Sequence, residues 1–505
     1  MCNYKLMKQL LVFVIFFFAA GAVLPVDTKH SNLNGISEAT TLSPSAERRL
    51  GDRIARDLYR DPDYLDDPVI ADYLQSIWQP LLAAARKRSE ISQELDATFA
   101  WQLLQGRDRT VNAFALPGGY FGIHLGLIGI VATQDELASV LAHELSHVTQ
   151  RHIARLITRQ SEQAPWLVGA MILGALAASK NPGGANAVIV GGQAAAAQSQ
   201  LNFSRDMERE ADRTGFGVSV DAGFAPQGFV SMFEKLQQNN RNNDSGNFPY
   251  LRSHPLTTER IADMKSRIPE GAVPTAGGTL EHSMVSARAR LLANGSVDSL
   301  RNWYLEAEPG ALAKQTNLQR AASLYGATLA ATKLREFTKA SAYATELGSI
   351  VANDEPAARQ WRYLRAELAV TEGNPEVALR TLGHASAPKA RAELLAWIPL
   401  KVAMRQSGVA ADAAQLWLLD HPTDASMWQQ LAIARASQDR MVTAVRAEAE
   451  INISQLDYAA AISRLKAAQA LSKTSAQDGD HIEASIVDVR LRQVEQLVRE
   501  QAIER

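Results

Sequence analysis

Two histidines separated by three residues constrain this chain more than any other feature of its sequence. They end the pentad His143 to His147, His-Glu-Leu-Ser-His, which lies inside the apolar run Leu137 to Val148. On a helix, residues four apart project from one face, so both imidazoles can reach one metal ion, and Glu144 points into the same cleft. The pentad therefore predicts a helix that carries the metal site of a zinc-dependent hydrolase.

Length and charge limit the possible classes of protein. The chain has 505 residues, of which 46% are hydrophobic and 21% charged, and its net charge is −2. A chain of this length exceeds one compact core, so we expect two or more domains. Because charges of both signs are interspersed, nothing indicates a nucleic-acid partner or an acidic membrane surface.

The N-terminus predicts export. Lys5 and Lys8 precede the apolar stretch Leu10 to Phe18, and Ala20-Gly21-Ala22 supplies small residues for cleavage, so we expect a signal peptide over residues 1–22. The alternative is an uncleaved anchor, but Leu10 to Leu24 is shorter than the roughly 20 residues that span a bilayer. We therefore expect no stable transmembrane span after the signal is cleaved. The only cysteine, Cys2, lies in this signal. Residues 23–44 are polar and predict a linker.

A small sheet is expected just before the pentad. Ala97 to Leu104 predicts one strand, and Thr110 to Ala115, Pro117-Gly118-Gly119 and Tyr120 to Ile123 predict strand, turn and strand. Thr133 followed by Glu136 fits a capping box, in which each residue satisfies a free N–H group at the start of a helix. The apolar pattern then predicts one helix that runs toward Ile157.

Two later segments leave alternatives open. Ala164 to Gln200 is rich in alanine and glycine, and it predicts either a core hairpin of helices or a lid over the metal site. Ser204 to Val220 predicts a helix on which Glu208 and Asp212 share a face, so one could bind metal while the other orients a ligating histidine. Alternatively, Asp206, Glu208 and Glu210 belong to a solvated face and pair with neighbouring arginines.

From about Leu280 the pattern is helical and rich in alanine. Similar positions recur in four places, Phe337 with Ala340, Pro375 with Ala378, Ala411 with Ala414, and Tyr458 with Ala461. The spacing is loose beside the 34 residues of a tetratricopeptide repeat, so a helical bundle is the alternative to a solenoid that binds protein segments. We therefore predict a mainly α protein with a metalloprotease domain of helices plus a small sheet over residues 45–270. A linker and helical repeat domain would cover residues 271–505.

Four motifs in sequence resemble a known family. They resemble the gluzincin metallopeptidases that include the CAAX prenyl protease, and the export signal and helical tail are similar to a periplasmic branch of that family. In chain order the motifs are Asn112 to Gly119, His143 to His147, Glu208 with Asp212, and Ser253-His254-Pro255 followed by Arg260.

The resemblance implies roles for particular residues. His143, His147 and Glu208 would be the ligands of one Zn²⁺ ion, and Asp212 would orient a ligand. Glu208 is preferred to Glu210 because the ligand glutamate of the family precedes the aspartate by four residues. Three protein ligands leave a position for a water of lowered pKa, whose proton Glu144 can take and pass to the leaving amine.

Two further implications concern substrate and regulation. Asn112, Ala113, Phe114 and Ala115 would form an edge strand that holds an extended substrate through its backbone. His254 would occupy the open position of the zinc ion as a switch, or else donate a hydrogen bond in the transition state or begin a helix. Arg260 would anchor that segment or stabilise the oxyanion.

The resemblance also implies a cellular role. It implies a periplasmic zinc endopeptidase, with possible chaperone activity, that acts on misfolded or stalled outer-membrane β-barrel proteins and contacts the barrel-assembly machinery. The alternative is a repeat scaffold or chaperone for outer-membrane assembly whose proteolysis is dormant. Because the mature chain lacks cysteine, we expect the interface between its domains to depend on packing alone.

Overall fold

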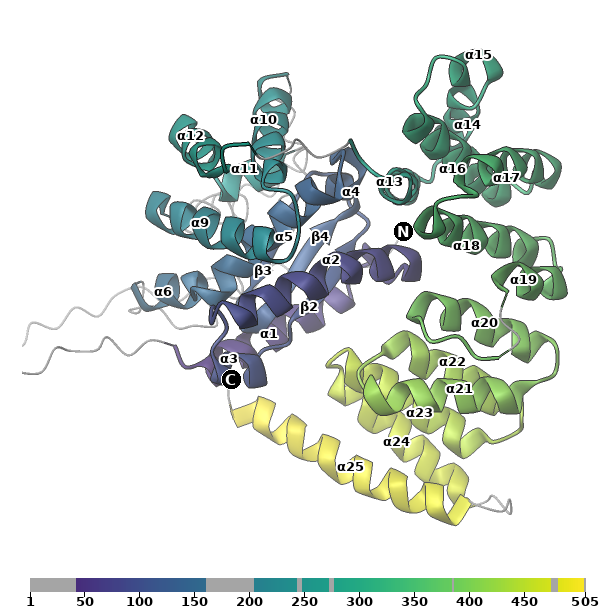
Figure 1. Ribbon diagram of the computed structural model, residues 1–505. Coiled ribbons are helices and arrows are strands. Elements are labelled where there is room, and N and C mark those ends of the chain that lie inside the picture. Colours follow the sequence, from purple (N-terminus) through teal and green to yellow (C-terminus); the bar gives the residue numbers. More distant parts are fainter. Residues whose placement is uncertain are drawn as a thin grey trace, which may run out of the picture. The chain divides into compact units, whose positions relative to one another are not determined.

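The computed structural model describes residues 42–159, 204–242, 248–271, 277–383, 386–473 and 480–503 (Figure 1). The predicted signal 1–22, most of the linker 23–44 and the segment Ala164 to Gln200 lie outside the described residues. Thr41–Arg505 form one unit of mutually contacting elements. Its division into a protease domain and a repeat domain stays a prediction. Among the described helices, none has the length and apolarity needed to cross a membrane.

The first part of this unit combines helices with a four-stranded sheet. Its elements are α1 (Pro44–Tyr59), β1 (Tyr64–Leu65), α2 (Pro68–Lys87), α3 (Gln93–Thr98), β2 (Gln102–Gly106), β3 (Ala113–Leu116), the 3-10 turn Pro117–Gly119, β4 (Tyr120–His124), α4 (Leu125–Ile130), α5 (Gln134–Thr149), α6 (His152–Arg159), α9 (Arg205–Asp221), α10 (Gln227–Asn242), α11 (Pro249–Ser253) and α12 (Thr258–Arg267).

The sheet has the order β1-β2-β4-β3, in which β2 and β4 are parallel and β3 and β4 antiparallel. The predicted strand, turn and strand around Pro117 is confirmed, because Gly118 and Gly119 adopt the positive φ angles, 73° and 79°, that reverse the chain. The prediction of a strand over Ala97 to Leu104 is wrong at its start. Ser92 caps α3 there, and the strand begins only at Gln102.

Each face of the sheet packs against different helices. Phe121 and Ile123 belong to the large core cluster that contains α2 and α5, whereas Tyr120 packs with α1 and with Ile153 of α6. This alternation follows from the two-residue period of a strand. Within the described chain β1 and β3 are the two edge strands, and β3 lies against α5 (Figure 1).

The helix that carries the pentad is α5. Thr133 caps it by accepting a hydrogen bond from the Glu136 N–H. The predicted capping box is only half correct, because the Glu136 carboxylate accepts from Ala132 N–H at 2.6 Å and pairs with Lys235. The prediction that one helix runs toward Ile157 is wrong.

The break between α5 and α6 has a definite cause. Arg151 has a φ of 54°, a left-handed conformation that ends a helix. Its guanidinium pairs with Glu47 at 2.9 Å and donates to the carbonyl of Leu42, so contacts with the start of the described chain hold the break in place.

The second part of the unit is wholly helical within the described residues. Its helices are α13 (Leu280–Ala293), α14 (Val297–Glu306), α15 (Pro309–Leu312), α16 (Asn317–Lys333), α17 (Phe337–Val351), α18 (Glu355–Thr371), α19 (Pro375–Leu382), α20 (Arg391–Ala403), α21 (Ser407–Asp420), α22 (Ala425–Ala436), α23 (Met441–Ser454), α24 (Tyr458–Ser472) and α25 (Asp480–Ile503). The predicted fold class, a mainly α zincin-like domain followed by a helical region, is confirmed.

The recurring alanines mark helix starts at three of the four predicted places. Phe337, Pro375 and Tyr458 are the first residues of their helices, and the alanine three residues later is fully buried in each. The prediction for Ala411 is shifted, because α21 begins at Ser407 and Ala410 holds the corresponding place. Small residues at this point let consecutive helices pack closely.

Buried ion pairs join the helical region to α2, so the expectation that this interface depends on packing alone is wrong. Arg288 of α13 contacts Asp67 at 2.7 Å, and Asp67 also caps α2 by accepting from Ile70 N–H. The guanidinium of Arg391 in α20 donates two hydrogen bonds to the Asp66 carboxylate, at 2.6 and 3.0 Å.

Candidate metal centre

Four buried side chains converge between α5 and the segment that follows α11. They are His143, His147, Glu208 and His254, and one potential ligand atom from each lies within 4.8 Å of the others. His143 Nε2 lies 2.9 Å from His147 Nε2, and each lies 3.5 Å from a Glu208 oxygen. His254 Nδ1 lies 3.0 Å from Glu208 Oε1.

The backbone places these groups for simple reasons. His143 and His147 share one face of α5, as their spacing predicts. Glu208 reaches them because α9 approaches α5 closely (Figure 1). A Cβ on Gly215, two turns further along α9, would lie 2.9 Å from the Ala142 carbonyl oxygen, so glycine is needed for this approach.

Asp212 and Arg260 support the cluster. His143 Nδ1 lies 2.9 Å from Asp212, which accepts two hydrogen bonds from Arg260 at 2.6 and 2.8 Å. Arg260 also contacts Glu208 at 2.7 Å and donates to the Pro255 carbonyl at 2.8 Å. Because these partners occupy a guanidinium that is only 4% exposed, the geometry favours anchoring over the oxyanion role.

Electrostatics hold the cluster in defined charge states. Burial would lower the pKa of His143, but the carboxylates of Asp212 and Glu208 outweigh it and raise that pKa to about 9. Burial and the charge on His143 lower the pKa of His147 well below its usual range. Burial would raise the pKa of Glu208, yet the histidines, His254 foremost, lower it. Glu208 is thus an anion, ready to bind a cation.

Glu144 is buried beside the cluster without a hydrogen-bond partner. It is 1% exposed, and neither carboxylate oxygen has a hydrogen bond within the described chain; the nearest ionic contact is His254 Nε2 at 3.4 Å. A buried carboxylate in this state is costly unless a ligand, water or metal completes its surroundings. Two or three imidazoles with one carboxylate are also a donor set that suits zinc.

The predicted edge residues lie in or beside the last strand of the described sheet. Ala113, Phe114 and Ala115 are in β3, and Asn112 directly precedes it and is buried. Among the described strands β3 pairs with β4 alone, which leaves its other edge without a strand.

A second contact supports the cluster from behind His147, and the sequence did not predict it. His152, fully buried at the start of α6, lies 2.8 Å from His147 and 3.1 Å from Glu210. The sequence pattern places Glu210 on a solvated face, and the resemblance sets it aside as a metal ligand. The sequence feature that indicates this pair is a third histidine, five residues after the pentad. Its side chain can be assigned to the cluster only once the helix break is known.

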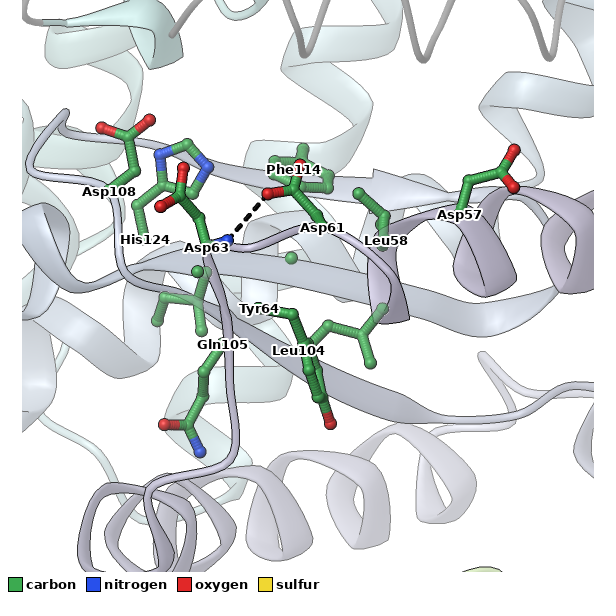
Figure 2. Close-up of a pocket in the computed structure, with 13 residues that line it drawn as sticks. Asp57, Leu58, Asp61, Asp63, Tyr64, Leu104, Gln105, Asp108, Phe114 and His124 are labelled. Carbon is green, nitrogen blue, oxygen red and sulfur yellow. Dashed lines mark hydrogen bonds between the residues drawn. The ribbon is translucent and has the colours of Figure 1, made fainter. Parts of the chain in front are cut away.

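A separate cavity of about 350 Å³ lies on the face of the sheet that also carries Tyr120. Figure 2 shows Asp63, Asp108 and His124 at one end and Asp57 at the other, with Phe114 between them. None of the four clustered residues lines it, so this cavity is distinct from the candidate metal centre.

Comparison with known proteins agrees with this geometry. Residues 72–268 match the model of peptidase family M48. This range includes all four sequence motifs, from Asn112 to Arg260. These residues are therefore similar to an M48 peptidase domain. The chain is therefore a metallopeptidase, and the prediction of a metal-dependent enzyme is confirmed.

Relatives extend the likeness beyond the M48 domain. The chain is 27% identical over 501 residues to the beta-barrel assembly-enhancing protease of Escherichia coli, covering 98% of this chain and 97% of that protein. A Vibrio cholerae protein provisionally given the same name is 32% identical over 317 residues, 62% of each chain. The mitochondrial metalloendopeptidase OMA1 of Saccharomyces cerevisiae is 28% identical over 202 residues, 39% of this chain and 55% of that protein. This chain is thus similar to an assembly-enhancing protease over nearly its whole length.

Proposed function

We propose that this protein is a zinc endopeptidase that cleaves misfolded or stalled outer-membrane β-barrel proteins in the periplasm. The observation that carries the proposal is the buried cluster of His143, His147 and Glu208 beside the carboxylate of Glu144, which has no hydrogen bond within the described chain. Such an arrangement pairs a metal site with a base at the same cleft.

The protein's own residues have distinct tasks in this proposal. His143, His147 and Glu208 hold the zinc ion, which supplies a Lewis acid that polarises the scissile carbonyl and acidifies water. Glu144 takes a proton from the attacking water and passes it to the leaving amine. Asp212 keeps His143 oriented, and Arg260 keeps Asp212 and Glu208 in place.

The substrate class follows from the edge strand and from the names of the relatives. The edge of β3 near Asn112 to Ala115 has no neighbouring strand among the described residues, and such an edge can pair with an extended backbone regardless of its sequence. A folded protein offers no such strand, so unfolded or stalled chains are suitable. From the relatives named for β-barrel assembly we infer the target proteins and the barrel-assembly machinery as a partner. From the predicted export signal we infer that the protein acts in the periplasm.

Metal content, cleavage and inhibition together test this function. We expect purified protein to contain zinc by elemental analysis and to cleave casein. A chelator should abolish cleavage, and added zinc should restore it, because Glu144 alone cannot polarise a peptide carbonyl. Protein without zinc and without activity after zinc is added would refute the enzyme proposal and favour the scaffold alternative.

Replacing His254 with alanine is expected to raise proteolysis severalfold. We propose that His254 is a fourth ligand that keeps the centre latent, because its Nδ1 lies 3.4 Å from His143 Nε2 inside the cluster. Casein cleavage at saturating zinc measures the effect, with His481→Ala, an exposed histidine on α25, as the control. Unchanged activity would refute the switch, and lower activity would instead assign His254 to hydrogen bonding in the transition state.

A further inference from the structure

The side chains of His147, His152 and Glu210 form a continuous row that leads away from the cluster. His147 Nδ1 lies 2.8 Å from His152 Nδ1, and His152 Nε2 lies 3.1 Å from Glu210 Oε2. Arg155 of α6 donates to the same Glu210 oxygen at 2.9 Å. Both histidines are fully buried, whereas Glu210 is about one third exposed.

The positions of the protons in this row follow from the chemistry of its ends. If the Nε2 lone pair of His147 faces a metal ion, its Nδ1 carries the hydrogen and must donate. His152 Nδ1 then accepts, so His152 carries its hydrogen on Nε2 and donates it to the Glu210 carboxylate. Every contact has one donor and one acceptor, and both imidazoles are neutral.

The helix break makes this row possible. In an uninterrupted helix, a residue five positions after His147 would point about 140° away from it around the axis. The left-handed Arg151 redirects the chain, so His152 begins a new helix with its ring against His147. The left-handed conformation is unfavourable for arginine, so the break is maintained against a local preference.

We propose that His152 is a positioning residue for the metal ligand His147, with Glu210 as the final acceptor. This inference rests on the proposed zinc site. Together with Asp212, which faces Nδ1 of His143, it gives each ligating histidine its own partner behind the ring. His152 fixes which nitrogen of His147 is free to bind metal and also fixes the orientation of the ring.

Zinc affinity, measured by competition with a chromogenic chelator, tests the proposal. We expect His152→Leu to weaken zinc binding by about 10- to 100-fold, the usual loss when the partner of a ligating histidine is removed. His152→Asn should retain most of the affinity, because its amide oxygen can still accept from His147. The control Thr158→Val alters a side chain of the same helix that donates to the Ala154 carbonyl, and it should bind zinc like the parent protein.

The outcomes separate this proposal from the proposed function. If the parent protein binds no zinc, the function itself fails. If the parent binds zinc and folded His152→Leu binds it within twofold as tightly, only the positioning role is overturned. If His152→Leu does not fold, Glu210→Leu decides: weaker zinc binding supports the row, and unchanged binding overturns it. Thermal unfolding of the chelated proteins establishes which variants fold.

Discussion

Glu144→Gln is expected to abolish casein cleavage while zinc remains bound. The amide keeps the shape of the side chain but cannot take a proton, and loss of a general base lowers a rate by about 10²- to 10⁴-fold. Because Glu144 is not one of the four clustered residues, the ligand set is unchanged. Initial cleavage rates and zinc content, measured on one preparation, check both parts.

A carboxylate elsewhere provides the control for this substitution. Glu234→Gln changes a half-exposed residue of α10 that pairs with Lys265, and it should cleave at the rate of the parent protein. If Glu144→Gln kept a tenth or more of the activity, Glu144 would not be the base. Loss of zinc from Glu144→Gln would mean that the carboxylate helps to hold the metal.

Arg260→Ala is expected to lower the free energy of unfolding by about 3–5 kcal/mol, since removing one partner of a buried pair leaves an uncompensated charge. Here two carboxylates, Asp212 and Glu208, lose the same cation. Denaturant unfolding of chelated protein measures the effect without a contribution from zinc.

The same helix supplies the comparison for Arg260. Arg267→Ala removes a partly exposed pair with Asp263, and such surface pairs contribute about 0–1 kcal/mol. Equal losses for the two arginines would show that the contacts of Arg260 add nothing beyond an ordinary surface pair.

Local patterns predicted the parts of the site that lie on one element. The spacing of His143 and His147, the turn at Pro117-Gly118-Gly119 and the helix that carries Glu208 all depend on residues a few positions apart. Such periodicities are visible in one sequence. The association of Glu208 with the pentad came from resemblance instead, because composition also allowed a solvated face.

The features that were missed depend on contacts between distant residues. Arg151 breaks the helix because Glu47, about a hundred positions earlier, holds its side chain. Glu136 pairs with Lys235, about a hundred positions later, instead of completing the capping box. No local pattern contains these partners, so tertiary contacts overrode the preferences on which the predictions were based.

Two consecutive aspartates make the first part of the chain a poor candidate for study in isolation. A fragment that stopped near residue 270 would keep Asp66 and Asp67 but lose Arg391 and Arg288. It would also lose His282, which contacts the Tyr73 hydroxyl at 2.6 Å and the Val131 carbonyl at 2.9 Å. Truncation would therefore leave the acidic start of α2 without its counter-charges, so the peptidase and the helices after it have to be produced and compared as one polypeptide.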